Sequence, residues 1–385
     1  MLKCIDLFCG CGGLSKGFIS AGFDIVAAFD NWDAAIQCYK MNFNHEVYQC
    51  DLNDWEKISN FISTIKHKII IGGPPCQDFS LAGNRVEGKR AQLTVSFAQI
   101  ICMVKPEYFV MENVVRANKS EAYENAKKLF KNAGYGLTEK TLNASYCGVP
   151  QNRKRFFCIG ALNKEDGFLD GVLAANLSEL PLTVYEHIGN EFKFEYYYRH
   201  PRTYNRRGIF SVHEPAPTIR GINRPMPPRY KFHPQDATTP DADVRALTFK
   251  ERSLLQTFPD DFIWLNSPTV NDQLIGNAVP VKLAEYVATC IRDYSEGTFN
   301  MRDVGFIDWL KTEKNYTARA ACDVLSRIRR IKRFIAQQED PKKQENDGQI
   351  NIAENEKTFV DLKSSIKSQL RRAKVLYNEY TKCVL

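Results

Sequence analysis

A cysteine and a glutamate are the residues whose types and surroundings best suit chemistry. Cys76 lies in the loop 72–80 (GGPPCQDFS), where two glycines and two prolines precede it. The all-isoleucine run 69–71 predicts a buried strand before this loop, and open α/β sheets place their sites at the carboxyl ends of such strands. A cysteine thiolate is a strong nucleophile. The pattern therefore favours covalent catalysis over the alternative, a redox-active or inert thiol.

Glu112 follows the apolar run 108–111 (YFVM), which predicts the next strand. If the two predicted strands are neighbours, the carboxyl group lies beside the cysteine loop. A carboxylic acid at that place can give a proton or a hydrogen bond to a group that gains negative charge during a reaction. The alternative interpretation is a helix cap or a salt-bridged surface carboxylate.

A glycine-rich turn at 9–13 (CGCGG) joins a predicted strand at 3–8 to a predicted helix at 14–20. Such turns let a ligand approach the backbone, and the amides of the following helix favour anionic groups. Asp30 ends the second predicted strand about 20 residues later, where an acidic side chain can accept hydrogen bonds from ribose hydroxyls. A nucleotide-like ligand is indicated, although glycine turns also occur where nothing binds.

Two further side chains lie where they can contact such a ligand. Trp32 offers a face for stacking, and its alternative interpretation is ordinary packing at the start of a helix. Asp51 follows the short run 48–50 and can accept a hydrogen bond from an adenine amino group. A helix cap formed together with Asn53 is the alternative for this residue.

Short apolar runs alternate with stretches of helical spacing up to residue 161. The predicted strands are 3–8, 25–29, 67–71, 108–111 and 156–159, and the predicted helices are 34–41, 92–103 and 120–132. This alternation predicts an α/β fold: a mixed, mostly parallel sheet with helices on both faces.

The rest of the chain divides into three parts. Beyond the catalytic and cofactor-binding domain predicted at 1–161, we expect a smaller irregular lobe at 162–272, rich in Pro, Arg and Tyr, and a return to the first domain at 273–296. A basic helical extension is expected at 297–385. Its two apolar helix faces consist of Ala321, Val324, Leu325, Ile328 and Ile331, and of Phe359, Leu362, Ile366 and Leu370.

Composition limits the class of protein. The 385 residues carry a net charge of +7, which permits a polyanionic partner without requiring one. We see no apolar run of the roughly 18 residues that cross a bilayer, and the opening MLKCID predicts a strand in place of a signal peptide. We expect a cytoplasmic protein with no membrane partner. Cys9 and Cys11 lack partnered ligands, so no metal is predicted.

Six blocks of sequence, in order along nearly all of residues 1–290, resemble those of the cytosine-5 DNA methyltransferase family of prokaryotic restriction–modification systems. The blocks are 6–18 (DLFCGCGGLSKGF), 72–80 (GGPPCQDFS), 111–114 (MENV), 151–155 (QNRKR), 245–262 (RALTFKERSLLQTFPDDF) and 273–280 (QLIGNAVP). Cys9 stands where the family often has Ser or Ala, and Asp78 where it often has a small residue. Neither departure removes a functional group.

The resemblance implies a Rossmann-like methyltransferase fold, with S-adenosylmethionine as methyl donor and S-adenosylhomocysteine as product. The residues implied to surround this cofactor are Phe8, Gly10, Gly12, Leu14, Asp30, Trp32, Asp51, Pro75, Asn277 and Ala278. The residues implied to act on cytosine are Cys76, Glu112, Arg153 and Arg155. Thiolate addition at ring position 6 makes carbon 5 nucleophilic, and a carboxylic acid near N3 assists. The Arg155 guanidinium suits the base carbonyl oxygen.

Double-stranded DNA is the implied substrate, with the target cytosine swung out of the duplex. Gln77 and Ser80 would support the loop and the vacated space. In the lobe, Arg206, Thr218 and Arg220 are predicted to contact DNA, and solvated loop residues are their alternative. The resemblance also suggests a monomer on DNA and a companion restriction endonuclease that acts separately.

Three other functions remain as alternatives. A tRNA cytosine-5 methyltransferase would carry the same catalytic residues, although the long arginine-rich lobe favours duplex DNA. A catalytically silent nucleic-acid-binding protein is disfavoured because every expected catalytic residue is present. A nicotinamide-dependent dehydrogenase would use the glycine turn but leaves the loop 72–80 unexplained.

Overall fold

The computed structural model describes residues 1–75, 92–189, 192–203, 206–239 and 243–297, and in the C-terminal part 301–317, 320–321, 323–325, 327–328, 331, 345–346, 349–350 and 364–384. The chain forms two compact units. The first consists of Met1–Phe168 and Leu180–Arg292, and the second of Leu169–Glu179 and Asp293–Leu385. Each unit has its own hydrophobic core.

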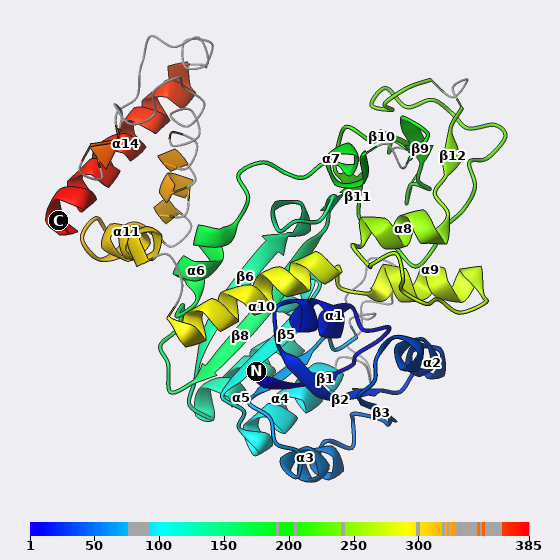
Figure 1. Ribbon diagram of the computed structural model, residues 1–385, viewed down its shortest axis with the longest axis horizontal. Coiled ribbons are helices and arrows are strands. Elements are labelled where there is room, and N and C mark those ends of the chain that lie inside the picture. Colours follow the sequence, from blue (N-terminus) through cyan, green and yellow to red (C-terminus); the bar gives the residue numbers. More distant parts are fainter. Residues whose placement is uncertain are drawn as a thin grey trace. The chain divides into compact units, whose positions relative to one another are not determined.

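A seven-stranded sheet in the order β3-β2-β1-β4-β5-β8-β6 forms the centre of the first unit (Figure 1). Its strands are β1 (Lys3–Leu7), β2 (Asp24–Asp30), β3 (Glu46–Gln49), β4 (Ile69–Gly72), β5 (Tyr108–Asn113), β6 (Tyr135–Asn143) and β8 (Lys154–Leu162). Strands β1 to β5 run parallel, whereas β8 is antiparallel to both β5 and β6. The predicted fold class, a mixed and mostly parallel sheet, is confirmed.

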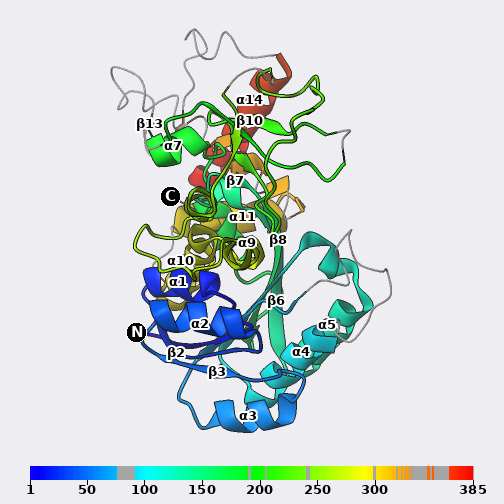
Figure 2. The ribbon, with the colours of Figure 1, turned by 90° about the vertical axis from the view of Figure 1, so that its right-hand side faces the viewer.

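Helices cover both faces of this sheet (Figure 2). One face carries α3 (Trp55–Ser63), α4 (Gln92–Val104) and α5 (Glu121–Asn132), and the other carries α1 (Gly13–Ser20), α2 (Asp33–Asn42) and α10 (Val281–Glu296). In β2, Phe29 belongs to the same core cluster as Phe97, whereas its neighbour Ala28 belongs to the cluster of Ile36. Strands β4 and β5 are buried along their whole length, which explains why their sequences are almost continuously apolar.

A smaller lobe, residues 180–272, is built on the three-stranded sheet β10-β9-β12. We call it the small lobe. Its elements are α7 (Val184–Ile188), β9 (Tyr196–Tyr198), β10 (Ile209–Ser211), β11 (Ala216–Pro217), β12 (Arg245–Ala246) and α8 (Phe249–Leu255), followed by α9 (Pro268–Asn277). The short strand β7 (Gln151–Asn152) pairs with β11 and so joins the small lobe to the segment before β8. Capping boxes begin α7 at Thr183 and α8 at Thr248.

The second unit contains α6 (Asp170–Asn176), α11 (Met301–Thr312), β13 (Glu345–Asn346), β14 (Gln349–Ile350) and α14 (Ser364–Val384). Its core includes the whole predicted face from Ala321 to Ile331, together with Leu370 of the second predicted face. Phe359 and Leu362 of that second face lie outside the described residues. Residues 169–179 fall within the irregular lobe that the sequence predicted at 162–272. In the structure they group with the C-terminal residues, because Ala174 and Ala175 pack into this core.

One strand of the first unit was not predicted from the sequence, and one long apolar stretch resembles a membrane-spanning helix in composition. Strand β6, at the edge of the sheet, was not predicted, because the sequence TEKTLN in its second half is almost entirely polar and shows no alternation of apolar and polar residues. The stretch Pro268–Glu296 is long and apolar enough to cross a bilayer by composition alone, but 67% of its most apolar window is buried inside the protein. The stretch consists of two helices, α9 and α10, and we interpret it as core packing. The first unit also contains the short 3-10 turns η2 (Val115–Lys119) and η3 (Ala144–Tyr146).

Candidate active site

The cysteine loop enters the site directly from β4. Residues 76–91 lie outside the described residues, so the predicted site residues Cys76, Gln77 and Ser80 have no structural account. The loop is described as far as Pro75, and it leaves a strand that pairs in parallel with β5, with Gly72 opposite Met111. The expectation that the two strands are neighbours is therefore confirmed, and Glu112 follows Met111 at the same edge of the sheet.

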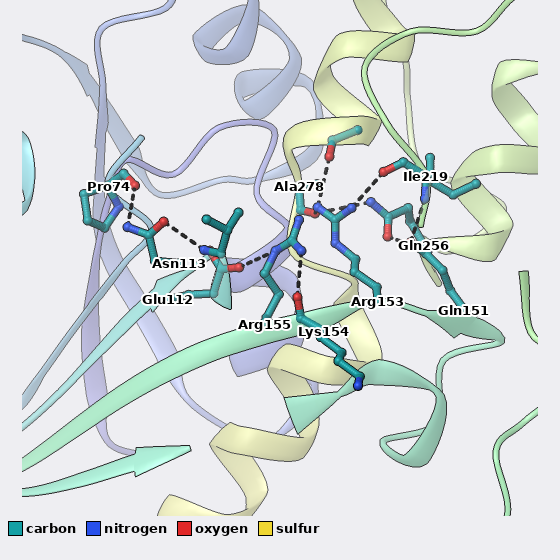
Figure 3. A network of polar contacts seen from close by, with 12 residues as sticks. Pro74, Glu112, Asn113, Gln151, Arg153, Lys154, Arg155, Ile219, Gln256 and Ala278 are labelled. Atoms are coloured by element: carbon teal, nitrogen blue, oxygen red, sulfur yellow. Dashed lines mark hydrogen bonds and ion pairs between the residues drawn. The ribbon is translucent and has the colours of Figure 1, made fainter. Parts of the chain in front are cut away.

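Two contacts hold the start of this loop against β5. Asn113 donates from Nδ2 to the carbonyl oxygen of Pro74 at 3.3 Å (Figure 3). A Cβ atom added to Gly73 would lie 3.2 Å from Glu112 Oε2, so this glycine lets the backbone pass close to the carboxylate. Asn113 was not among the predicted site residues. The sequence signal for Asn113 is its position directly after Glu112 at the end of an apolar run. The structure shows that this strand is buried to its last residue.

Glu112 and Arg155 form an ion pair, with 2.8 Å between Glu112 Oε1 and Arg155 Nε. Their side chains are 10% and 14% exposed, so the pair is largely shielded from water. Burial raises the pKa of Glu112 above its usual value, and the guanidinium groups of Arg155 and Arg153 partly oppose this shift. The carboxyl group consequently keeps a proton at higher pH than an exposed glutamate does, which suits a proton or hydrogen-bond donor.

Arg153 is buried, with 1% of its surface exposed, and Figure 3 shows its guanidinium among backbone carbonyl groups. Nη1 donates to the carbonyl oxygen of Ile219 at 2.8 Å, and Nη2 donates to those of Gly276 and Ala278, each at 3.0 Å. The structure thus brings Arg153 to the small lobe and to residues 276–278, where α9 ends and the chain turns toward α10. The resemblance grouped it with the residues that act on cytosine.

Two glutamines complete this buried network. Gln151 Oε1 accepts from the amide of Ile219 at 2.9 Å, and its Nε2 donates to Gln256 Oε1 at 2.9 Å. Gln256 in turn donates to the carbonyl oxygens of Ile275 and Ala278, at 2.5 and 3.2 Å. Gln256 was also absent from the predicted site residues. The only signal for it in the sequence is an amide among apolar residues in the run LLQTF.

The glycine turn is open at one position and closely packed at others. Phe8, Gly10 and Gly12 all have positive φ, at 60°, 55° and 94°. Among the described residues, a Cβ atom added to Gly10 would meet no atom within 4 Å. At Gly12 it would lie 2.3 Å from Phe43, so this glycine serves packing. Leu14 is buried in the helix that follows.

Gly13 brings the first and last blocks of the resemblance together. A Cβ atom added at this position would lie 2.3 Å from the carbonyl oxygen of Val279 and 3.4 Å from Ala278. The turn that contains Asn277 and Ala278 therefore packs directly on the glycine turn, although more than 260 residues separate them in the chain. Two of the segments predicted to surround the cofactor thus lie side by side.

Asp30 connects the glycine turn to the start of α2. Oδ2 accepts from the amide of Gly10 at 2.8 Å, and Oδ1 accepts from the amide of Trp32 at 2.9 Å. Burial raises the pKa of Asp30, and these backbone hydrogen bonds oppose the shift. Trp32 packs half-buried beside the α2 cluster. Asp51 is exposed and accepts from the amide of Asn53 at 3.0 Å in a local turn. It does not cap α3, whose N-cap is Asp54.

The predicted DNA-contacting residues of the small lobe differ in their surroundings. Thr218 donates to the carbonyl oxygen of Asn152 at 2.9 Å, and Arg220 donates to that of His200. Arg199 donates to the carbonyl oxygen of Thr218 at 3.0 Å. Burial and neighbouring guanidinium groups lower the pKa of Arg199 to about 10 and lower that of Arg220. Arg206 is exposed.

Groups of three or more potential metal ligands are absent from the described parts of the chain. The prediction of no metal stays a prediction, because residues 76–91 and parts of the C-terminal unit are not covered by this observation.

Comparisons with known proteins extend over the first unit. The C-5 cytosine-specific DNA methylase family matches residues 2–293. The Type II methyltransferase M.HindV of Haemophilus influenzae is 51% identical over 297 residues, which are 77% of this chain and 98% of that protein. M.HgiDI of Herpetosiphon aurantiacus, also a Type II methyltransferase, is 50% identical over 297 residues, which are 76% of this chain and 95% of that protein.

Solved structures show the same fold. A putative DNA modification methyltransferase encoded within a prophage of E. coli has a TM-score of 0.57 at 23% identity, and the match covers 77% of this chain and 100% of that one. The S. pombe Dnmt2 methyltransferase has a TM-score of 0.56 at 21% identity, over 76% of this chain and 99% of that one. The chain therefore belongs to the C-5 cytosine-specific DNA methylase family and is a DNA (cytosine-5)-methyltransferase.

Proposed function

We propose that this enzyme methylates carbon 5 of a specific cytosine in double-stranded DNA through a covalent adduct with Cys76. The observation that carries the proposal is the pairing of β4 with β5, because it sets the loop that leads to Cys76 against Glu112. An acid beside a nucleophile is the arrangement that addition to a pyrimidine ring requires.

The other cysteines support this choice of nucleophile. Burial raises the pKa of the thiols in the sheet and the glycine turn, among them Cys4, Cys9, Cys11 and Cys158. On the helices, burial raises the pKa of Cys102 to about 11. Such thiols carry little thiolate at neutral pH and are poor nucleophiles. Cys76 is the cysteine whose flanking glycines and prolines suit an exposed loop.

In the proposed reaction the Cys76 thiolate forms a bond to carbon 6 of the cytosine, and the electron pair of the 5,6 double bond moves toward carbon 5 and N3. Glu112 gives a proton or a hydrogen bond to N3 as charge develops there. Carbon 5 then takes the methyl group. Loss of the proton from carbon 5 and departure of the thiolate restore the double bond, and Glu112 recovers its proton from N3. We assign no residue to the removal of the carbon 5 proton.

Arg155 has two proposed tasks. Its Nε holds the Glu112 carboxylate through the ion pair, and its guanidinium is suited to the carbonyl oxygen of cytosine. A lysine would supply the charge without the planar set of donors. We therefore propose Glu112, Arg155 and Cys76 as the residues that touch the base.

S-adenosylmethionine, which methyltransferases of this family use, supplies an electrophilic methyl group when bound. The residues present fit it: the open side of Gly10 leaves room for backbone approach, and the Asp30 carboxylate lies beside that glycine. We propose that Asp30 accepts from the ribose hydroxyls and that Trp32 lies against the adenine. Pro75, Asp51 and the turn with Asn277 and Ala278 are the other proposed contacts.

The small lobe is the proposed reader of the DNA sequence. Arg199 and Arg220 are both half-buried. Burial and nearby guanidinium groups, Arg220 in the case of Arg199 and Arg202 and Arg252 in the case of Arg220, lower their pKa values. An anionic partner such as a DNA phosphate would relieve the repulsion between these cations. Arg220 and Thr218 are the first candidates for base contacts, and Arg206, Gln77 and Ser80 for contacts to the backbone or the vacated space.

The Type II relatives suggest the biological setting. We infer that the enzyme is the modification partner of a restriction endonuclease that acts separately on the same sequence. We further propose that it works as a monomer on DNA in the cytoplasm, since the proposed catalytic, cofactor and DNA contacts can all come from one chain.

The test of the proposed function is covalent trapping. DNA that carries 5-fluorocytosine at the methylated position should form an adduct with the wild-type protein that survives denaturation, because fluorine cannot leave as the proton does. Cys76→Ser should abolish both trapping and methyl transfer, whereas Cys383→Ser, which changes an exposed cysteine in the second unit, should alter neither. Methyl transfer by Cys76→Ser at the wild-type rate, or trapping of tRNA in place of DNA, would contradict the proposal.

A further inference from the structure

The five residues 151–155 meet three parts of the molecule. Gln151 lies in β7, Arg155 lies in β8, and Arg153 is the residue between the two strands. Alternate side chains of extended backbone point to the same side, and Figure 3 shows these three side chains on one side of the segment. Arg155 reaches Glu112 in β5. The other two reach segments far away in the sequence.

The first of these segments is Ile219 in the small lobe, which lies between Thr218 and Arg220. Gln151 accepts its amide hydrogen, and Arg153 donates to its carbonyl oxygen, at 2.9 and 2.8 Å. Side chains of the segment 151–155 therefore bind both the backbone amide and the backbone carbonyl group of Ile219. A shift of Ile219 would break two buried hydrogen bonds and leave buried polar groups without partners, which is unfavourable.

The second segment is the turn at 276–278. Arg153 donates to the carbonyl oxygens of Gly276 and Ala278, which lie on either side of Asn277 in the chain. The turn also touches the small lobe directly, because a Cβ atom added to Gly276 would lie 2.1 Å from the amide nitrogen of Gly221. One guanidinium thus spans the two segments at the point where their backbones meet.

We propose that Arg153 is a positioning residue that holds the DNA-reading segment at Ile219 and the cofactor turn at 276–278 in register with the strand that carries Arg155. This inference rests on the proposed function of these two segments. It replaces the direct role on cytosine that the resemblance implies for Arg153. Its consequence is that apparent affinities for DNA and for S-adenosylmethionine depend on the same side chain.

Gln256 provides a second, more selective probe. It donates to the carbonyl oxygens of Ile275 and Ala278, and no hydrogen bond from it to Ile219 is found among the described residues. Gln256→Met keeps the length of the side chain and removes its amide group. Gln151 loses Gln256 as an acceptor but keeps the carbonyl oxygen of Leu255 at 3.1 Å and its contact with Ile219. The variant should therefore disturb the cofactor turn more than the DNA-reading segment.

The experiment measures initial rates of tritiated methyl transfer to a plasmid DNA that the wild-type enzyme methylates, with each substrate varied in turn. Active enzyme is counted by 5-fluorocytosine trapping, so that misfolded protein does not lower kcat. Arg153→Lys should raise KM for both DNA and S-adenosylmethionine at least about fivefold, with kcat within about threefold of wild type. Gln256→Met should raise KM for S-adenosylmethionine by about threefold or more and change that for DNA less than about twofold.

The matched control is Arg292→Lys. Arg292 also donates to a backbone carbonyl, that of Ala21 at 2.8 Å, at the end of α1. Both KM values of this variant should stay within about twofold of wild type. This variant therefore measures how the loss of an arginine-to-carbonyl hydrogen bond elsewhere in the first unit changes the two KM values.

Two results would overturn the inference. Unchanged KM values with a large fall in kcat for Arg153→Lys would assign the residue a direct role on the base, and unchanged kinetics with a lowered Tm would assign it to stability alone. If Arg153→Lys does not fold, an unchanged S-adenosylmethionine KM in Gln256→Met is the overturning result. Methylation of no DNA by the wild type would instead refute the proposed function, and with it this inference.

Discussion

Replacement of Arg155 by methionine tests the electrostatics of the site most directly. The change removes the cation from an ion pair whose side chains are only 10% and 14% exposed, and it leaves Glu112 buried without its strongest opposing charge. Removal of one partner of a buried pair typically costs about 3–5 kcal/mol, because the remaining charge is neither hydrated nor compensated. We expect Arg155→Met to lose stability within this range at alkaline pH.

The loss should depend on pH in a predictable direction. Burial already raises the pKa of Glu112 above the 4.5 of an exposed glutamate, and Arg155 opposes the shift. Without Arg155, the folded-state pKa rises further above the unfolded-state value. A raised folded-state pKa contributes stability that is fully present below the unfolded-state pKa and is lost as pH rises through the folded-state pKa. The free energy of unfolding of Arg155→Met should therefore be close to that of the wild type near pH 4, and the difference between the two should be largest near pH 8.

Urea unfolding of the wild type, Arg155→Met, Glu112→Gln and the double variant forms the assay, with each protein measured at about pH 5 and about pH 8. Glu112→Gln carries no charge, so the double variant should recover at least half of the stability that Arg155→Met loses at the higher pH. A loss below about 1 kcal/mol, or a loss that is equal at both pH values and not rescued by Glu112→Gln, would refute the ion-pair reasoning.

Three further outcomes are expected. Glu112→Gln should lower kcat by about 10²- to 10⁴-fold, measured by methyl transfer, with little change in DNA affinity by fluorescence anisotropy; an effect confined to affinity would contradict the acid role. Gly13→Ala places a Cβ atom 2.3 Å from the Val279 carbonyl oxygen and should weaken S-adenosylhomocysteine binding at least about tenfold in calorimetry; wild-type binding would show that the glycine turn and the 277–279 turn can separate freely. Burial raises the pKa of Asp6 from 3.8 to about 7, so the contribution of this residue to stability should fall from pH 4 to pH 7. Relative to the wild type, Asp6→Asn should gain roughly 2–4 kcal/mol in the free energy of unfolding between these pH values. The same pH dependence of unfolding in both proteins would refute this.

The sequence was most informative where chemistry and local backbone requirements coincide. The apolar run before Cys76 and the run before Glu112 could be predicted as strands, because strands buried on both faces are continuously apolar. The expected neighbourhood of the two residues then followed from the rule that parallel strands end at one edge of the sheet. The glycine turn and Asp30 could also be predicted from the sequence, because their spacing is set within a single strand–helix–strand unit.

The network around Arg153 could not be predicted in this way. Spacing shows that Gln151, Arg153 and Arg155 share one side of a strand, but it does not show what faces each of them. Arg153 and Arg155 look equivalent in the run QNRKR, yet one holds a carboxylate and the other three backbone carbonyls. The role of Gln256 depends on segments that lie 19 to 105 residues away in the chain.

The amino-acid sequence by itself determined the family and the α/β fold and predicted the reactive groups that we propose, because those depend on residue type and on periodicities of a few residues. Only the tertiary structure decided which buried polar groups bind one another. It also showed that residues 169–179 belong to the second unit and that Gly13 packs on the turn near the end of the first unit. These contacts join segments remote in the chain, and their energies come from burial and hydrogen-bond satisfaction that no local pattern encodes.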